Sequence, residues 1–176
     1  MDWDNYFLSI CSSVAKNSKC LSRQIGAILV DDKSIISTGY NGPPRGIVHC
    51  GEWVLSNNLL CEEFRKRALP VPQKGRMFSE CCPRQVLGYK SGEGLHICPA
   101  AHAEVNAIVN AARQGVRIKG AKMYMDCPIP CRECMKLIIN AGIEEIICTK
   151  LEYYDEMSKF LIENSDIKVR RFKINA

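Results

Sequence analysis

A histidine, a glutamate and two cysteines are the residues of this sequence with the clearest chemical potential. His102 and Glu104 are separated by one residue, and Cys131 follows a proline and lies three positions before Cys134. One imidazole and two thiolates are ligands of the kind that a catalytic zinc ion takes, with a fourth position left for water. The sequence therefore predicts a catalytic zinc site at His102, Cys131 and Cys134.

Glu104 is the residue that we expect to move protons at this site. The pattern His-x-Glu followed by Pro-Cys-x-x-Cys is typical of zinc-dependent nucleobase deaminases, in which the glutamate is not a zinc ligand. Glu104 would take the proton of the attacking water, pass it to ring N3 while oxygen attacks C4 of cytosine, and then help to protonate the departing amine. Simpler interpretations are a closed structural zinc and an ordinary acid in the first turn of a helix. The combined pattern favours catalysis.

The elements that must position these residues follow from hydrophobic spacing. The spacing predicts helices at 3–17, 102–114, 131–141 and 155–164, and strands at 25–30, 35–40, 121–126, 145–149 and 168–172. This alternation favours an α/β sheet with helices on both faces. His102 and Cys131 would each begin a helix, and the partial positive charge there favours thiolates.

The pattern is irregular between the second strand and the helix that begins at His102, with one short helix expected at 61–68. No linker-like composition marks a boundary, so we expect a single domain over 1–176 with a cysteine-bearing insertion at about 48–99. The chain has 11 cysteines. In a reducing compartment, cysteines are more often ligands, catalytic groups or buried residues than disulfides. We expect Cys11 and Cys148 to be core residues.

Charge and hydropathy narrow the class of protein. The formal net charge is +5, which suits a phosphate-bearing ligand but is too weak to indicate a nucleic-acid surface. No apolar run is long enough to span a bilayer, and the acidic start lacks the pattern of a secretory signal. We expect a cytoplasmic protein, in the host cytoplasm if a phage encodes it, with no membrane partner and no stable nucleic-acid partner.

Several linked motifs carry a family resemblance: CLSRQIGAILV at 20–30, STGYNGPPRG at 37–46, HAEVNAI at 102–108, PCRECMKLII at 130–139 and NAGI at 140–143. With these motifs the chain resembles the deoxycytidylate deaminases of phages, bacteria and animals. The resemblance implies a three-layer α-β-α cytidine deaminase-like fold with a mixed five-stranded sheet. It also implies conversion of dCMP to dUMP and ammonia, which supplies the precursor of dTMP. A homo-hexamer is implied as well, with dCTP as activator, dTTP as inhibitor and Mg²⁺ accompanying the triphosphate.

The resemblance also implies roles for single residues. Asn41 matches the asparagine that hydrogen-bonds the sugar, although a turn asparagine is the simpler interpretation of the residue alone. The other substrate candidates are Ala103 within HAE, Ser22 and Arg23 for the 5′-phosphate, and Tyr153 or Tyr154 over the base. The effector candidates are Gly39, Tyr40, Asn41 and Gly42 together with Arg113, which without the family would be a solvated helix residue.

A second, structural zinc occurs in parts of this family, and Cys20 and Cys50 match two of its positions. The nearest candidates for the remaining ligands are His96 and Cys98, and further candidates are Cys81, Cys82, His49 and Cys61. Some relatives use a carboxylate just before HAE, but Pro99-Ala100-Ala101 offers none. An irregular insertion would gain stability from a metal. The alternative is a set of buried free thiols.

Three other functions stay open. The enzyme could act on dCTP, or on both dCMP and dCTP. A tRNA adenosine deaminase would use the same zinc centre, but it should carry a basic surface with aromatic side chains, and aromatic residues make up only 7% of this chain. A non-catalytic zinc-stabilised regulatory or nucleic-acid-binding module would tolerate loss of Glu104 without any effect except on stability.

Overall fold

A computed structural model describes residues 2–56, 61–62, 66, 82–90 and 92–172. The chain divides into two compact units. The first unit comprises Met1–Ser18, Gln24–Asn41 and His102–Ala176, and the second comprises Lys19–Arg23 and Gly42–Ala101. The expected insertion at 48–99 falls within the second unit, while the expected single domain over the whole chain stays a prediction.

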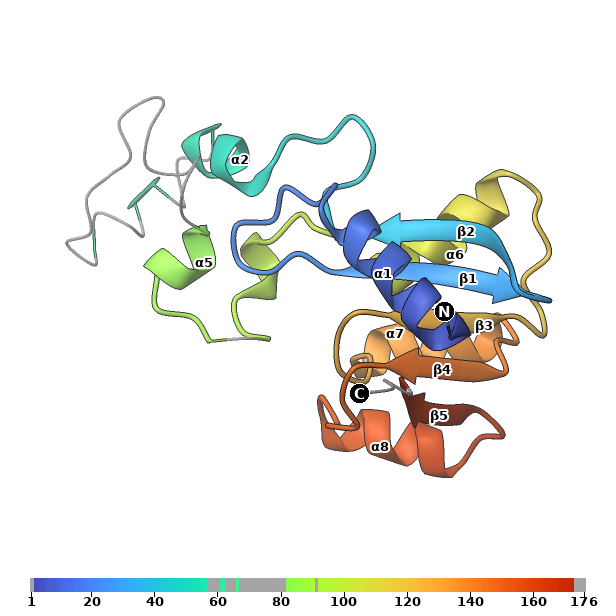
Figure 1. The fold of residues 1–176 in the computed structure, drawn as a ribbon. Helices are drawn as coiled ribbons and strands as arrows, with labels where there is room; N and C mark the ends of the chain where they lie inside the picture. Colours follow the sequence, from blue (N-terminus) through green and yellow to red (C-terminus); the bar gives the residue numbers. More distant parts are fainter. Residues whose placement is uncertain (1, 57–60, 63–65, 67–81, 91, 173–176) are drawn as a thin grey trace. The chain divides into compact units, whose positions relative to one another are not determined.

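A mixed five-stranded sheet forms the centre of the first unit, with the strand order β2-β1-β3-β4-β5 (Figure 1). The strands are β1 (Gly26–Asp31), β2 (Ser34–Tyr40), β3 (Lys122–Met125), β4 (Glu145–Cys148) and β5 (Lys168–Arg171). β1 pairs antiparallel with both β2 and β3, whereas β3, β4 and β5 are parallel. This arrangement confirms the α/β fold with a mixed five-stranded sheet.

Helices cover both faces of the sheet. Successive side chains of a strand point to opposite faces, and β1 is buried along most of its length, so both of its faces are covered. On one face, Phe7 and Cys11 of α1 (Trp3–Ala15) pack against Ile28. On the other face, Leu29 packs in a core with three further helices, α6 (Ala103–Arg113), α7 (Arg132–Asn140) and α8 (Glu156–Glu163). In Figure 1, α1 crosses in front of the sheet, while α6 and α7 lie behind it. The first unit therefore has the three-layer α-β-α architecture.

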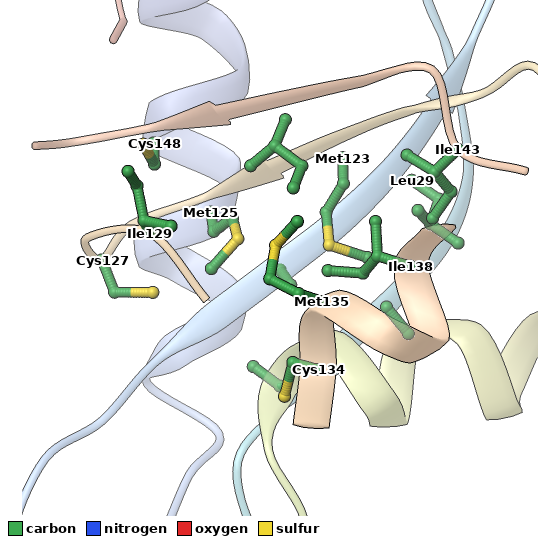
Figure 2. Close-up of a cluster of buried hydrophobic side chains, with 14 of the residues drawn as sticks. Leu29, Met123, Met125, Cys127, Ile129, Cys134, Met135, Ile138, Ile143 and Cys148 are labelled. Atoms are coloured by element: carbon green, nitrogen blue, oxygen red, sulfur yellow. The ribbon is translucent and has the colours of Figure 1, made fainter. Parts of the chain in front are cut away.

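The larger core joins the sheet to the helix that begins after Cys131. Met135 and Ile138 of α7 are fully buried against Met123 and neighbouring sheet residues (Figure 2). Cys134 lies at the rim of this cluster, in the first turn of α7. As predicted, Cys11 and Cys148 are core residues with no exposed surface. The packing of α7 thus fixes where the cysteines at its start can lie.

The second unit contains short helices that hydrophobic spacing did not predict. They are α2 (Cys50–Ser56), α5 (Pro83–Val86) and the 3₁₀ helix η1 (Leu95–Ile97). Each is too short to show a clear apolar period. The helix predicted at 61–68 falls mostly outside the described residues. No helix in the described ranges is long and apolar enough to cross a membrane.

An ion-pair network ties the first helix to the far strands of the sheet. The Arg170 guanidinium donates to both carboxylate oxygens of Asp4, at 2.6 and 3.0 Å, and its Nε donates to Glu145 at 2.9 Å. Lys122 reaches the other oxygen of Glu145 at 2.8 Å. Because the Asp4 side chain is only 8% exposed, these charge-assisted bonds are shielded from water.

Replacing Asp4 with alanine is therefore expected to destabilise the first unit. Loss of a buried, charge-assisted pair should lower the free energy of unfolding by about 2 kcal/mol. Glu152 pairs with Lys150 on the surface, so Glu152→Ala is the matched control and should cost no more than about 0.5 kcal/mol. Urea unfolding followed by circular dichroism measures both changes. Equal losses in the two variants would show that the network contributes no more than a surface pair.

Candidate active site

The first two predicted metal ligands occupy the same position in two helices. His102 is the N-cap of α6, with φ −72° and ψ 156°, and Cys131 is the N-cap of α7, with φ −68° and ψ 163°. In neither helix does the N-cap side chain accept a hydrogen bond from the first turn. An N-cap side chain ordinarily accepts such a bond. Neither side chain is therefore used to cap its own helix.

The structure brings the three predicted ligands together. The Nδ1 atom of His102 lies 3.2 Å from the sulfur of Cys134 and 3.5 Å from the sulfur of Cys131. Among the described residues, these three form the one group of His, Cys, Asp or Glu whose ligand atoms all lie within 4.8 Å of one another. Tetrahedral zinc with the usual bond lengths separates its nitrogen and sulfur ligands by roughly 3.5–3.8 Å. The Cys131 distance falls in this range and the Cys134 distance lies just below it, so the donor set fits a zinc ion held through Nδ1 and two thiolates.

The pKa values of the two cysteines are shifted in opposite directions. A hydrogen bond from the Cys134 thiol, with a further contribution from His102, lowers the pKa of Cys131 to about 4 despite its burial. The same hydrogen bond, together with burial and the nearby Glu104 carboxylate, raises the pKa of Cys134 far above its ordinary value. The Cys131 sulfur thus favours the thiolate form and the Cys134 sulfur the thiol form. A divalent cation would favour loss of the remaining thiol proton, because zinc binds the thiolate forms.

Glu104 lies in the first turn of α6, beside the three ligands. It is 5% exposed, and burial raises the pKa of its carboxyl group above the ordinary value. The interactions with its own backbone N–H and with the charge of His102 act in the opposite direction. A desolvated carboxylate accepts a proton more readily than a solvated one. Its position therefore suits the proton transfer predicted for it.

The edge strand β2 holds α6 in place through polar and steric contacts. Ser37 donates to the backbone oxygen of Ala107 at 2.7 Å. From the helix, Asn106 donates to the oxygen of Tyr40 at 2.7 Å and Asn110 to that of Thr38 at 2.9 Å. The two asparagine bonds use carbonyl groups of the edge strand, and all three bonds fix the helix that begins after His102 along the strand.

Asn41, predicted to contact the sugar, also has a structural role, because it pairs with Ile25. Its Oδ1 atom accepts a hydrogen bond from the backbone N–H of Ile25 at 2.8 Å, and the two backbones pair again at 3.1 Å through the Asn41 N–H. Ser18 donates to the Asn41 carbonyl at 2.7 Å. The side chain is thereby fixed at the end of β2, in the same unit as His102.

The remaining substrate and effector candidates divide between the two units. Ala103 is fully buried in the first unit. The exposed candidates of that unit are Tyr153 and Tyr154 in the loop before α8, Tyr40 at the end of β2 and Arg113 in the last turn of α6. Ser22, Arg23 and Gly42 belong to the second unit. Their roles in binding a nucleotide stay predictions.

Four cysteines of the second unit line one pocket: Cys20, Cys50, Cys82 and Cys98. The pKa of Cys50 is raised to about 11, by burial first and then by the neighbouring thiol groups of the other three. His49 also lines this pocket. His96, in contrast, is exposed and lies edge-on to the ring of Tyr89 at 6.1 Å between ring centroids. Of the other candidate ligands, Cys61 is half-buried and Cys81 falls outside the described residues.

Sequence reasoning placed Cys82 only among the further candidates for the second metal site. It is the N-cap of α5, and Pro83 follows it at the first helical position. Proline is favoured there, so the pair Cys82-Pro83 was the available signal for a cysteine at a helix start. Cys50 also lies at the start of a helix, as the first residue of α2, but glycine follows it.

A His-Cys-Cys metal centre at the starts of two helices, beside a buried glutamate and on an α-β-α scaffold, defines the class of the zinc-dependent nucleobase deaminases. Residues 1–150 match the family model described as "Cytidine and deoxycytidylate deaminase zinc-binding region". The chain belongs to this family.

Curated relatives agree with this assignment. The chain is 35% identical over 153 residues to the deoxycytidylate deaminase of Enterobacteria phage T4, covering 85% of this chain and 77% of the relative. It is 31% identical over 154 residues to that of Mycobacterium phage D29, covering 85% and 95%. The Saccharomyces cerevisiae deoxycytidylate deaminase is 31% identical over 170 residues, covering 97% of this chain but 45% of the relative. The chain thus spans less than half the length of this yeast protein.

A solved structure shows the same fold. The dCMP deaminase of cyanophage S-TIM5, in complex with dCMP and dUMP, superposes with a TM-score of 0.62 and 19% identity, covering 95% of this chain and 94% of that chain. The predicted cytidine deaminase-like fold is confirmed by this likeness.

Proposed function

We propose that the protein hydrolyses dCMP to dUMP and ammonia. The observation that carries this proposal is the buried Glu104 carboxyl group beside the His102, Cys131 and Cys134 cluster. The relatives from phages T4 and D29 bear the name deoxycytidylate deaminase, which supports dCMP as the substrate. The reaction supplies the precursor of dTMP from free nucleotides in the cytoplasm, which is the host cytoplasm if a phage encodes the protein.

His102, Cys131 and Cys134 would hold zinc, which when bound supplies a water molecule acidified for attack on carbon. Glu104 takes the proton of that water and transfers it to ring N3 as a C–O bond forms at C4. Glu104 then takes the second proton of the former water and delivers it to the exocyclic nitrogen, so that the C4–N bond breaks and ammonia leaves. The burial of Glu104 beside the three ligands supports its part in both transfers.

The finer features are proposed from the resemblance of the motifs. Asn41 would contact the deoxyribose, Ser22 and Arg23 the 5′-phosphate, Ala103 the base, and Tyr153 or Tyr154 would cover it. A homo-hexamer would be regulated at Gly39–Gly42 and Arg113 by dCTP as activator and dTTP as inhibitor, each with Mg²⁺. Deamination of dCTP alone, or of both dCMP and dCTP, is the second candidate function. The residues that contact the phosphate groups would determine which of these nucleotides is the substrate. A tRNA adenosine deaminase is the third.

Ammonia release from a panel of substrates tests this function. Zinc-loaded protein is incubated with dCMP, dCTP, CMP, deoxycytidine and a tRNA anticodon stem-loop, each with and without dCTP or dTTP at matched Mg²⁺. We expect fast turnover of dCMP that dCTP raises and dTTP lowers. Turnover of dCTP would reassign the phosphate contacts, and activity on the stem-loop alone would favour RNA editing. No activity on any substrate with zinc bound would favour the non-catalytic module.

We further propose that the second unit binds a structural zinc through Cys20, Cys50, Cys82 and Cys98. The pocket that these four cysteines line supports this set, and four thiolates are a common ligand set of structural zinc. Cys82 takes the place predicted for His96, which does not line the pocket. Because metal binding is coupled to folding, the four sulfurs would draw closer together when the ion binds.

Replacing Cys82 should therefore lower the amount of bound zinc from two equivalents per chain to one. We expect Cys82→Ser and Cys50→Ser to lose one equivalent and His96→Ala to lose none, as measured by elemental analysis after dialysis. Loss of the cooperative unfolding of the second unit should accompany the loss of zinc. If His96→Ala loses zinc and Cys82→Ser keeps it, the ligand set is the one with His96. A single zinc in the unmodified protein would mean that the four cysteines are buried free thiols.

A further inference from the structure

Asp155 connects the start of α8 to the start of the helix that carries two metal ligands. As the N-cap of α8, its Oδ1 atom accepts hydrogen bonds from the Ser158 backbone N–H at 2.7 Å and from the Ser158 hydroxyl at 3.1 Å. Its other oxygen, Oδ2, accepts a hydrogen bond from the backbone N–H of Arg132 at 3.3 Å. One carboxylate thus serves two helices.

The Arg132 N–H is the first one of α7, and it belongs to the peptide that joins Arg132 to the ligand Cys131. The first N–H groups of a helix have no partner within the helix and need one elsewhere. The N-cap side chain usually accepts from the second or third of these groups, but the Cys131 side chain makes no cap bond to its own helix. Its sulfur instead faces His102 at 3.5 Å. Asp155 satisfies the first of these donors from outside the helix.

Electrostatics favour the same arrangement. The N-terminus of each helix carries partial positive charge, so a carboxylate shared by two of them stabilises both. The Cys131–Cys134 segment is a single turn at the start of α7. Because the Arg132 N–H belongs to the peptide that follows Cys131, holding that N–H restrains the backbone from which the Cys131 side chain projects.

We propose that Asp155 is a positioning residue of the catalytic metal site, which holds the first turn of α7 so that Cys131 and Cys134 face one ion together with His102. The proposal rests on the zinc site of the proposed function. The same bond to the Arg132 N–H joins Asp155, the residue after Tyr153 and Tyr154, to the metal-bearing helix.

Two substitutions at Asp155 separate this role from that of an ordinary helix cap. Serine is as good an N-cap as aspartate, so Asp155→Ser keeps the bond to the Ser158 N–H, but its shorter side chain does not reach Arg132. Asparagine has the length of aspartate, but its single oxygen can accept from the Ser158 N–H or from the Arg132 N–H and not from both, because its NH₂ group is a donor. Asp155→Asn therefore removes the charge and one of the two acceptor oxygens.

A second pair of substitutions tests the donor instead of the acceptor. Arg132→Pro removes the N–H group at the first helical position, where proline is favoured. The ψ of 163° at Cys131 already suits a residue before proline. Arg132→Ala is the matched control, because it removes the same exposed side chain and keeps the N–H.

The readout is zinc release from the loaded protein to an excess of a colorimetric chelator, together with the absorption spectrum of the Co²⁺-substituted protein. We expect Asp155→Ser and Arg132→Pro to release zinc about tenfold faster and to show an altered cobalt–thiolate spectrum. Arg132→Ala should behave as the unmodified protein does, and Asp155→Asn, which keeps one of the two acceptor oxygens, should fall between it and Asp155→Ser. In kinetics with dCMP, kcat should fall in the first two variants with little change in KM.

Unchanged release and spectra in Asp155→Ser and Arg132→Pro would overturn the proposal and leave Asp155 as the cap of α8 alone. Thermal unfolding of the metal-free variants shows whether Asp155→Ser or Arg132→Pro has lost its fold. If one of them has, the zinc release and the spectrum of the other variant test the proposal. If the unmodified protein itself binds no zinc at His102, Cys131 and Cys134, it is the proposed function that fails, since the effect of Asp155 is measured only against a loaded site.

Discussion

Replacement of Glu104 with glutamine should abolish turnover of dCMP while zinc and the fold are retained. Glutamine has nearly the same shape but cannot take a proton from water or deliver one to N3 and the leaving nitrogen. General acid–base catalysis contributes about 10²–10⁴-fold, and Glu104 is proposed for several transfers, so kcat should fall by at least about 10³-fold. Because a buried carboxyl group that is costly to ionise is removed, the melting temperature should be unchanged or higher.

Glu133→Gln is the matched control for this experiment. Glu133 is also in the first turn of a helix that bears metal ligands, but its side chain is 65% exposed and pairs with Lys136. We expect full activity in this variant. Ammonia release, bound zinc and thermal unfolding are measured for both. Full activity in Glu104→Gln would remove Glu104 from the mechanism and favour the non-catalytic module.

Gly39→Ala is expected to have the second-largest effect, through the position of α6. A Cβ atom at Gly39 would lie 2.2 Å from the Ala107 nitrogen and 2.4 Å from the Ala103 oxygen. These are backbone atoms of the helix that begins after His102, so they move only if the helix moves. Overpacking of this kind costs about 1–3 kcal/mol, and a displacement of about 1 Å at the site can cost about 10²-fold in rate. Urea unfolding and kcat measure the two effects.

Thr38→Ala is the control for Gly39→Ala, because Thr38 is exposed on the same strand and its backbone bond to Asn110 does not depend on its side chain. This variant should be close to the unmodified protein in both measurements. A Gly39→Ala protein with normal stability and normal basal turnover that no longer responds to dTTP would mean that Gly39 acts at an effector site. Loss of stability and of basal rate together would mean that it is needed for packing against α6.

Local spacing was sufficient to predict every strand of the sheet and the four long helices of the first unit. Residues two apart share a strand face, and residues three or four apart share a helix face. The same argument applies to the site, since Cys131 and Cys134 lie one turn apart whatever the rest of the chain does. His102, Glu104 and the two cysteines were therefore candidates from the residue types and spacing alone, and the structure shows that the three predicted ligands lie together. In the second unit the helices are too short to show a period, so α2 and α5 were not predicted.

Contacts between distant segments were decided only by the tertiary structure. No spacing rule joins Asp155 to the N–H of Arg132, 23 positions away, or brings Cys82 to the pocket with Cys20. Gly39 was predicted as an effector residue, and the folded chain shows that a side chain there would meet the backbone of α6. Residue types and local periods determine which groups can do chemistry, because these depend on neighbours in the chain. Which groups meet depends on how the helices pack on the sheet, and that packing is fixed by buried contacts across the whole fold.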